Sequence, residues 1–515
     1  MAATSRQDDS PDDNHDGESS ATSLESSMHL HHHNHTAHTG RTDTSKHTGG
    51  WLLAILLVAQ LMVILDITAV NIAMPNIAKD LGISGTNMSW TITSYSLIFG
   101  SLLLLGGRAA DLLGRRRVFL TGLGVFTISS LLSAMAGSGD ALFTARAGQG
   151  LGAAMLSPAA LSIITTAFHG QQRAKALAAW GAIGGAGAAI GVLLGGVLTQ
   201  LADWRMIFFV NPPVAIALAI AATKIVPADT KRPQWKGLDL RGAAVVTASI
   251  GTIVYAITQG DQAGWTSAQT LIMGSAGLAG LGLFAACERR AEQPLLRIER
   301  LRDRAVSGGM ILMLLGAGLI FGLFLLCSLY LQFVLGKGPL STGLSFIPLA
   351  LAAGAGAHAG GHVINRHGVR GPLAAAFGIA SVGLLLLSRL GPHGSYVQDI
   401  LPGILIAGFG LGIATVAISV SILTGARPEE TGMLSGLNST GHEIGGTLGI
   451  AVFTSIAAAV SGGLTGSSGA SGIADAFLIA AHIAAVGSIA ALIALPAAHV
   501  FLPKLRLNPQ TMPIH

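Results

Sequence analysis

Charged residues are scarce in this sequence: 11% of the 515 residues are Asp, Glu, Lys or Arg, against 51% that are hydrophobic. Soluble globular domains carry about 25% charged residues, so the chain has too little charge to cover a water-exposed surface of its size. The 69 glycines point the same way, because spanning helices use Gly for close packing. The composition argues against a soluble enzyme and predicts a chain solvated largely by lipid.

Cysteine and nucleotide-binding signals are also nearly absent. Cys287 and Cys327 lie in or beside apolar runs and form neither a disulfide framework nor a metal-ligand spacing. The sequence contains no GxxxxGK[ST] phosphate loop and no basic patch interleaved with aromatic residues. We therefore expect no cofactor, no metal site and no nucleic-acid partner.

The first 48 residues are rich in Ser, Thr, Asp and His and carry eight acidic residues against three basic ones. Without an apolar stretch, this segment is not a signal peptide, and we expect a disordered cytoplasmic tail. Its eight histidines could gather around a transition metal. A tolerated low-complexity extension is the simpler interpretation.

Long apolar runs fill the rest of the sequence. A spanning helix needs about 20 apolar residues, and this criterion predicts an all-α polytopic membrane protein with fourteen transmembrane helices. They are expected at 51–76, 88–107, 118–137, 141–167, 174–200, 205–226, 241–259, 267–286, 306–335, 341–364, 371–390, 397–424, 434–461 and 474–502. An even number of spans places both termini on one side of the membrane.

Basic residues are distributed unequally between the expected loops. One face collects the Lys and Arg residues at 115–117, 173, 175, 224–241, 289–304, 366, 370, 427, 504 and 506. The opposite face has Lys79, Arg205, Lys337 and Arg389. Because loops rich in Lys and Arg stay inside the cell, we expect a protein of the cytoplasmic membrane with both termini in the cytoplasm.

Two sequence patterns recur at an offset of 254 residues. GRAADLLGRR at 107–116 returns as GHVINRHGVR at 361–370, and Gly187, Gly191 and Gly195 return as Gly441, Gly445 and Gly449. Parallel repeats are a known transporter architecture with the substrate site between the repeats. The expected parts are the His-rich tail (1–48), a six-helix bundle (49–230), two additional helices (231–300), and a second six-helix bundle with a short tail (301–515).

Four ordered motifs resemble those of one transporter family. LDITAVNIAMP at 65–75 resembles the first-helix signature of the fourteen-helix drug:proton antiporters of the major facilitator superfamily, and 107–117 resembles that superfamily's loop between helices two and three. RAGQGLGAA at 146–154 is similar to its proton-linked motif, and the stretch that begins with YLQFVLG at 330–336 and ends near Pro348 is similar to the family's ninth and tenth helices. The resemblance implies a major facilitator fold that exports drugs or antibiotics in exchange for protons.

One motif departs from the family pattern. The sequence at 187–196 reads GAAIGVLLGG, with Val192 where the antiporter motif carries a proline. Glycines at 187, 191, 195 and 196 still permit close helix packing, but a proline-dependent bend is not expected. Antiport and uniport therefore both remain open.

Asp66 and Arg146 are charged residues inside predicted helices. A charge at the membrane centre costs about 3 kcal/mol, so Asp66 should face a cavity, where an apolar site favours its protonated form. Arg146 cannot lose its proton and lies one turn from Gln149, so it would hold a nearby acid or water. These three residues are candidates for proton coupling. The alternatives are an Asp66 satisfied permanently by Thr68 or Asn71 and an Arg146 that is a structural clamp.

Glu443 lies beside His442 inside the predicted thirteenth helix. An acid in a spanning helix marks a functional site by default. Glu443 could carry a second proton or serve as the counter-charge of cationic substrates, unless it lies near the helix end.

The loop at 107–117 is the expected gate, with Gly107, Asp111, Gly114, Arg115 and Arg116 as its key residues. A charge pair there can latch one conformation, although the arginines could also serve membrane orientation alone. Asn365 replaces the acid in the second repeat, which predicts a weaker latch.

His358 and His362 are one helical turn apart, which raises a membrane-embedded metal enzyme as a different class. Neither an HExxH motif nor another histidine box accompanies them. We therefore expect a non-enzymatic secondary transporter, a monomer in the lipid bilayer that moves small molecules and protons. An exporter or uniporter dedicated to one native metabolite is the alternative within transport.

Overall fold

The computed structural model describes residues 41–507 except for 84, 169, 230–232, 234, 236–237, 292–293, 297, 425–430 and 462–465. Residues 1–40 of the expected His-rich tail and Arg427 therefore lie outside the described residues. The chain divides after Lys46, and His47–His515 forms one compact unit. All candidate membrane spans belong to the second unit.

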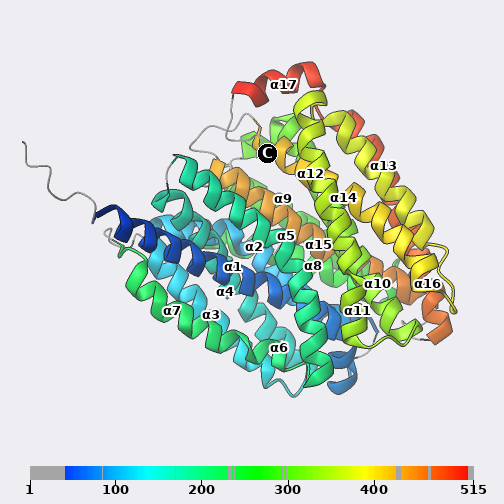
Figure 1. Ribbon diagram of the computed structural model, residues 1–515. Helices are drawn as coiled ribbons and strands as arrows, with labels where there is room; N and C mark the ends of the chain where they lie inside the picture. Colours follow the sequence, from blue (N-terminus) through cyan, green and yellow to red (C-terminus); the bar gives the residue numbers. More distant parts are fainter. Residues whose placement is uncertain are drawn as a thin grey trace, which may run out of the picture. The chain divides into compact units, whose positions relative to one another are not determined.

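The described residues form helices and no strand (Figure 1). The first half consists of α1 (Arg41–Asp80), α2 (Trp90–Leu113), α3 (Arg115–Ala134), α4 (Gly139–Ala167), α5 (Gly170–Leu201), α6 (Met206–Phe209) and α7 (Asn211–Ile225). An additional pair follows, α8 (Leu240–Ala263) and α9 (Ala268–Glu288). The second half consists of α10 (Arg304–Leu329), α11 (Pro339–Ser345), α12 (Ile347–His367), α13 (Arg370–Leu387), α14 (Leu401–Leu423), α15 (Thr431–Ser461) and α16 (Gly466–Ala494), and α17 (Ala498–Leu507) comes last. Short 3₁₀ or π turns lie at Gly85–Ser89, Ile298–Arg302, Tyr330–Val334 and Tyr396–Ile400.

Twelve segments of the described chain are long and apolar enough to cross a membrane. α5 and α15 add helices of 32 and 31 residues, so the fourteen predicted helices are compatible with the structure. The all-α polytopic fold class is confirmed. The predicted last helix at 474–502 is wrong in its bounds, because α16 ends at Ala494 and α17 begins at Ala498. Pro496 lies in the break, where it lacks a backbone N–H and disfavours helical geometry in the preceding residue.

Glycines bring corresponding helices together in the two halves. In the first half, a Cβ added to Gly195 of α5 would lie 2.6 Å from the Cα of Ala69 in α1. In the second half, a Cβ added to Gly445 of α15 would lie 2.6 Å from the carbonyl oxygen of Leu314 in α10. Only glycine allows backbones to approach so closely. The repeat in the sequence is therefore matched by a repeat in the packing.

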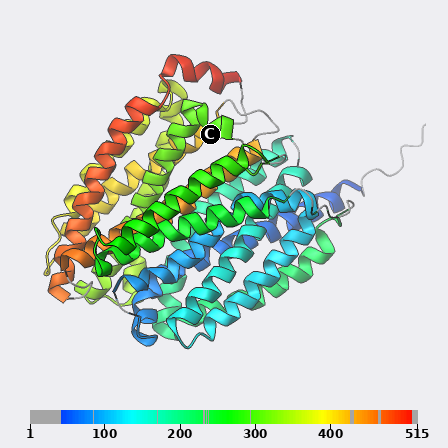
Figure 2. The same cartoon turned by 180° about the vertical axis from the view of Figure 1, so that it is seen from behind.

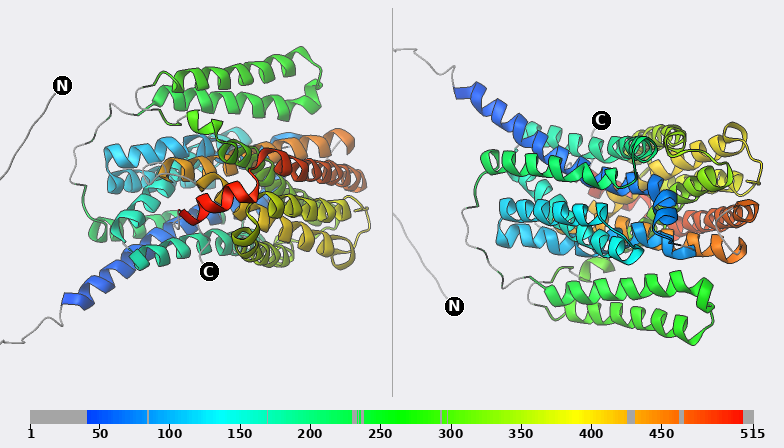
Figure 3. Two further views of the ribbon diagram at one scale, coloured as in Figure 1. Left: turned by 90° about the horizontal axis from the view of Figure 1, so that it is seen from above. Right: turned by 90° about the horizontal axis from the view of Figure 1, so that it is seen from below.

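The two halves contact each other in two regions. Near the Asp80 end of α1, the Gln332 side chain donates to the carbonyl of Ile72 (3.1 Å), and Gly196 of α5 lies against α11. Elsewhere α2 packs against α15, and α8 packs against both of these helices. Figure 2 shows α8 and α9 in green on the face turned away in Figure 1, and Figure 3 shows this pair side by side, outside both halves.

Candidate functional site

Asp66 lies in α1 with its side chain buried; the residue is 1% exposed. Its carboxylate accepts hydrogen bonds from Gln149 Nε2 (2.9 Å), Asn211 Nδ2 (2.9 Å) and Arg146 Nη1. Arg146 and Gln149 come from α4, and Asn211 begins α7. The structure thus brings together the three residues that the sequence predicted for this cluster and adds a fourth.

The partners of Asp66 differ from those expected within its own helix. Thr68 donates instead to the carbonyl of Ile64 (2.8 Å), and Asn71 donates to that of Ile67 (3.0 Å). The Asp66 carboxylate takes its donors from α4 and α7 instead. In this conformation Asp66 is one member of a buried ion pair.

Arg146 is fully buried and contacts three helices besides its own. Its Nε donates to the carbonyl of Thr91 (3.1 Å), and its Nη1 also donates to Gln149 Oε1 (3.0 Å). The guanidinium lies 4.4 Å from the ring centre of Tyr95 and 5.7 Å from that of Phe208. Its Nη2 has no hydrogen-bond partner within the described part of the chain. The two N–H groups of Nη2 are therefore left for water or for a new acceptor.

Two serines of α3, missed by the sequence analysis, hold the amide groups of this cluster. Ser133 Oγ donates to Gln149 Oε1 (2.9 Å). Ser130 Oγ accepts from Gln149 Nε2 (3.2 Å) and Asn211 Nδ2 (3.0 Å) and donates to the carbonyl of Phe208 (2.9 Å). Asn211 had a usable signal, an amide inside an apolar stretch, whereas serines in an apolar helix are too common to stand out.

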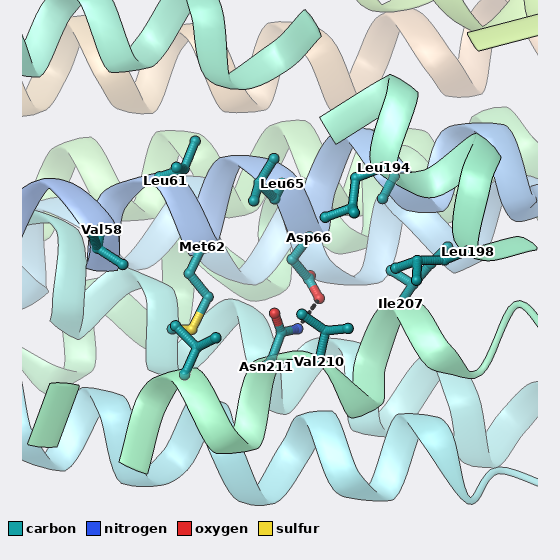
Figure 4. A pocket seen from close by; sticks show the side chains of 12 residues that line it. Val58, Leu61, Met62, Leu65, Asp66, Leu194, Leu198, Ile207, Val210 and Asn211 are labelled. Carbon is teal, nitrogen blue, oxygen red and sulfur yellow. Dashed lines mark hydrogen bonds between the residues drawn. The ribbon is translucent and has the colours of Figure 1, made fainter. Parts of the chain in front are cut away.

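A cavity of about 160 Å³ adjoins the cluster between α1, α5 and α7. In Figure 4, Asp66 and Asn211 meet at its wall, and Met62, Leu65 and Leu198 are among its apolar lining residues. Sites for drug-sized ligands measure about 300–1,000 Å³. This cavity is too small for such a ligand and has room for a few water molecules, which occupy about 30 Å³ each.

Glu443 lies in the second half on α15, far from the helix ends, and is 9% exposed. It faces α2: a Cβ added to Gly100 would lie 2.7 Å from the Cβ of Glu443. Its Oε1 lies 3.5 Å from Nδ1 of His442. Its Oε2 finds no hydrogen-bond partner among the described residues. Glu443 is therefore a buried carboxylate that the protein satisfies incompletely.

The expected gating loop joins α2 to α3. Asp111 and Arg115 pair at 3.4 Å, but they are 59% and 39% exposed, so the pair contributes little to stability. Gly107 packs loosely, with a would-be Cβ 3.7 Å from Pro158 of α4.

A stronger contact to this loop comes from Asp229, which the sequence analysis missed. Its carboxylate accepts from the backbone N–H groups of Arg116 (3.3 Å) and Arg117 (3.0 Å), at the N-terminus of α3, where negative charge is stabilised. Gly114 has φ +109°, and a Cβ there would lie 2.5 Å from the Asp229 carboxylate. Glycine is required at this position for both reasons.

The glycine motif of α5 faces two helices. Gly187, Gly191 and Gly195 lie against α1, whereas Gly196 lies against Pro339 and Leu340 of α11. α5 continues as one helix through the buried Val192.

His358 and His362 lie on α12 with ring centres 4.7 Å apart, and both are exposed. Among the described residues, no group of three or more His, Cys, Asp or Glu side chains could hold a metal ion.

Comparisons with known proteins agree on one family. The model of the Major Facilitator Superfamily matches residues 56–450. The puromycin resistance protein pur8 of Streptomyces alboniger is 38% identical over 410 residues, 79% of this chain and 81% of that protein. The cephamycin export protein CmcT of Amycolatopsis lactamdurans is 34% identical over 422 residues, covering 81% and 87%. The lincomycin resistance protein of Streptomyces lincolnensis is 32% identical over 451 residues, covering 86% and 90%.

Solved structures show the same fold. The POT family transporter PepTSo superposes with a TM-score of 0.60 at 14% identity, covering 88% of this chain and 98% of that one. A bacterial homologue of the human lysosomal transporter Spinster, inward-facing and unoccupied, gives a TM-score of 0.55 at 16% identity, covering 91% and 99%. The chain is a multi-pass membrane transporter rather than an enzyme, and it belongs to the Major Facilitator Superfamily.

Proposed function

We propose that this transporter exports small organic molecules, antibiotics among them, across the cytoplasmic membrane in exchange for protons. The names of its relatives, which refer to puromycin resistance, cephamycin export and lincomycin resistance, support the substrate class and the direction. The observation that carries the proton exchange is the buried pair of Asp66 and Arg146.

A proton on Asp66 changes the free energy of this cluster. Protonation removes the negative member of the pair and leaves Arg146 as an uncompensated buried cation, which is strongly unfavourable. The cluster then favours a different arrangement of α1 against α4. Protonation driven by the gradient is thereby coupled to a conformational change of the transporter. Gln149 and Asn211 fix the carboxylate from a second side, so the change affects α4 and α7 together.

Replacing Asp66 by Asn tests the coupling, because an amide keeps the shape but cannot take up a proton. We expect Asp66→Asn to be inserted and folded but to lose gradient-driven export of puromycin from cells. Asp140 is exposed in the first turn of α4, the helix that carries Arg146 and Gln149. Asp140→Asn is therefore the matched control and should export normally. Full export by Asp66→Asn at equal protein level would assign Asp66 to structure alone.

The proposed orientation places the Arg115 end of the helices and both termini in the cytoplasm, with 49–230 and 301–515 as rocking halves and 231–300 as the additional pair. The excess of Lys and Arg at this end supports it. In a variant lacking Cys287 and Cys327, a new cysteine at Gly264 should react with an impermeant thiol reagent from outside, and one at Arg290 should not. Reversed labelling would overturn the orientation.

A transporter dedicated to one native compound is the second candidate. It is favoured by the relatives that are named for a single antibiotic. Thermal stabilisation of the purified protein by a panel that includes puromycin, lincomycin and a cephamycin separates the two. Stabilisation by one compound alone supports the dedicated transporter, and stabilisation by several supports the broad exporter.

A further inference from the structure

A tyrosine of α2 adjoins the buried pair of Asp66 and Arg146. Tyr95 is fully buried, and its ring packs 4.4 Å below the guanidinium of Arg146. Its hydroxyl has no hydrogen-bond partner among the residues that the structure describes. A buried hydroxyl without a partner is unfavourable, so its retention calls for a function or for a partner in another state of the protein.

Glu443 approaches the same stretch of α2 from the other half. Its Cβ is in contact with the backbone at Gly100, between one and two turns beyond Tyr95. Tyr95 lies within electrostatic range of Asp66, Arg146 and Glu443. Tyr95 is thus electrostatically linked to the buried carboxylates of both halves.

Unpartnered polar atoms concentrate on the two helices that meet here. Twelve buried side-chain atoms of the described residues have no hydrogen-bond partner, and seven of them belong to α2 and α15. They are Thr91 Oγ1, Thr93 Oγ1, Tyr95 OH, Ser96 Oγ, Asn438 Oδ1, Thr440 Oγ1 and Glu443 Oε2. Buried polar atoms are satisfied by protein groups or by ordered water. The described residues of these two helices therefore leave polar atoms available to ordered water.

We propose that Tyr95 passes protons between Glu443 and Asp66 and so joins the two halves in one coupling path. This proposal rests on the proposed proton exchange. In the step, the Tyr95 oxygen takes the proton of the Glu443 carboxyl group while the Tyr95 hydroxyl gives its own proton toward the Asp66 carboxylate, directly or through water. One proton moves, Glu443 becomes ionised, Asp66 becomes neutral, and Tyr95 ends unchanged. Because the tyrosine oxygen accepts one proton as it donates the other, the transfer leaves no tyrosinate in the buried site.

The test separates proton movement from substrate movement. Wild type, Tyr95→Phe and Tyr330→Phe are reconstituted in vesicles, and each is assayed for puromycin counterflow and for puromycin-dependent proton flux. Tyr330 is the matched control, because it is equally buried but its hydroxyl already donates to the carbonyl of Gly391 (2.5 Å). We expect Tyr95→Phe to keep counterflow and to lose about 100-fold in proton flux, the order of a general acid–base contribution. Tyr330→Phe should keep both activities.

The other outcomes separate the proposals. Proton flux of Tyr95→Phe equal to that of wild type overturns the relay, and so does an equal loss of counterflow and proton flux, which shows a packing role. A wild type that counterflows puromycin without moving protons contradicts the proposed proton exchange itself. As a second measurement, Tyr95→Phe combined with Glu443→Gln should lose no more proton flux than the more affected single variant, because both changes interrupt one path.

Discussion

The two halves of this transporter treat a buried carboxylate in opposite ways. In the first half, Asp66 accepts hydrogen bonds from Arg146, Gln149 and Asn211. In the second half, Glu443 has one histidine at 3.5 Å and an oxygen that the described residues leave without a partner. A carboxylate with three donors is fixed in position, whereas a carboxylate with an unpartnered oxygen can still accept a hydrogen bond. Each half thus has one buried carboxylate, and the two differ in how completely the described residues satisfy them.

The loops that end α2 and α12 show the same divergence. Gly114 and Gly368 are equivalent in the repeat, and both have positive φ, +109° and +71°. The first loop lies against the Asp229 carboxylate, whereas the second lies against Ala498 of α17. Charge holds one loop and apolar packing holds the other. Asn365, the substitute for Asp111 in the second repeat, has a buried oxygen without a partner in the described chain.

The largest effect on stability is expected at Arg146, because this cation pairs with the buried carboxylate of the first half. Arg146→Met removes the cation and leaves Asp66 buried with two amide donors. Losing one member of a buried pair costs about 3–5 kcal/mol, so the free energy of unfolding should fall by that order. Thermal unfolding of the purified protein in detergent measures it.

The double variant Asp66→Asn/Arg146→Met is the control for this prediction. It removes both charges, so we expect it to recover most of the lost stability without recovering export. A double variant as unstable as Arg146→Met would show that Arg146 stabilises the fold through Thr91 and Tyr95 rather than through Asp66.

The sequence predicted the helices well because a spanning helix needs a long apolar run, and such runs are visible without the fold. It also predicted that Asp66, Arg146 and Gln149 serve one function, since buried charges must find partners. It could not predict Asn211 or Ser130, because their role depends on how α3 and α7 pack around α1. The full set of Asp66 partners has the same cause: one helix shows an acid in an apolar run, and the neighbouring helices supply the donors.

A moderate effect is expected for the two loop glycines. Gly114→Ala and Gly368→Ala both force an alanine into a conformation that costs about 1–3 kcal/mol. Only Gly114→Ala also displaces a carboxylate, Asp229, from the N-terminus of α3. We therefore expect similar losses of thermal stability but a larger loss of export for Gly114→Ala. Gly124→Ala, inside α3 with open space around it, should be neutral or slightly stabilising. Equal export by both loop variants would remove Asp229 from gating.

The smallest effect on stability is expected at Glu443, and it decides what the second half contributes. Glu443→Gln removes a charge that the protein satisfies incompletely, so the free energy of unfolding should change by less than about 1 kcal/mol. Export should change far more.

If Glu443 is the counter-charge of cationic substrates, the variant loses export of puromycin, an amine, and keeps export of neutral compounds, since only cations lose an electrostatic partner in a low-dielectric site. If Glu443 carries a proton to Asp66, both classes fail together, because every substrate shares the coupling step. Efflux of one cationic and one neutral compound at matched protein levels, with the exposed Glu299→Gln as control, separates these outcomes, and unchanged export of both compounds would leave the first half as the sole site of coupling.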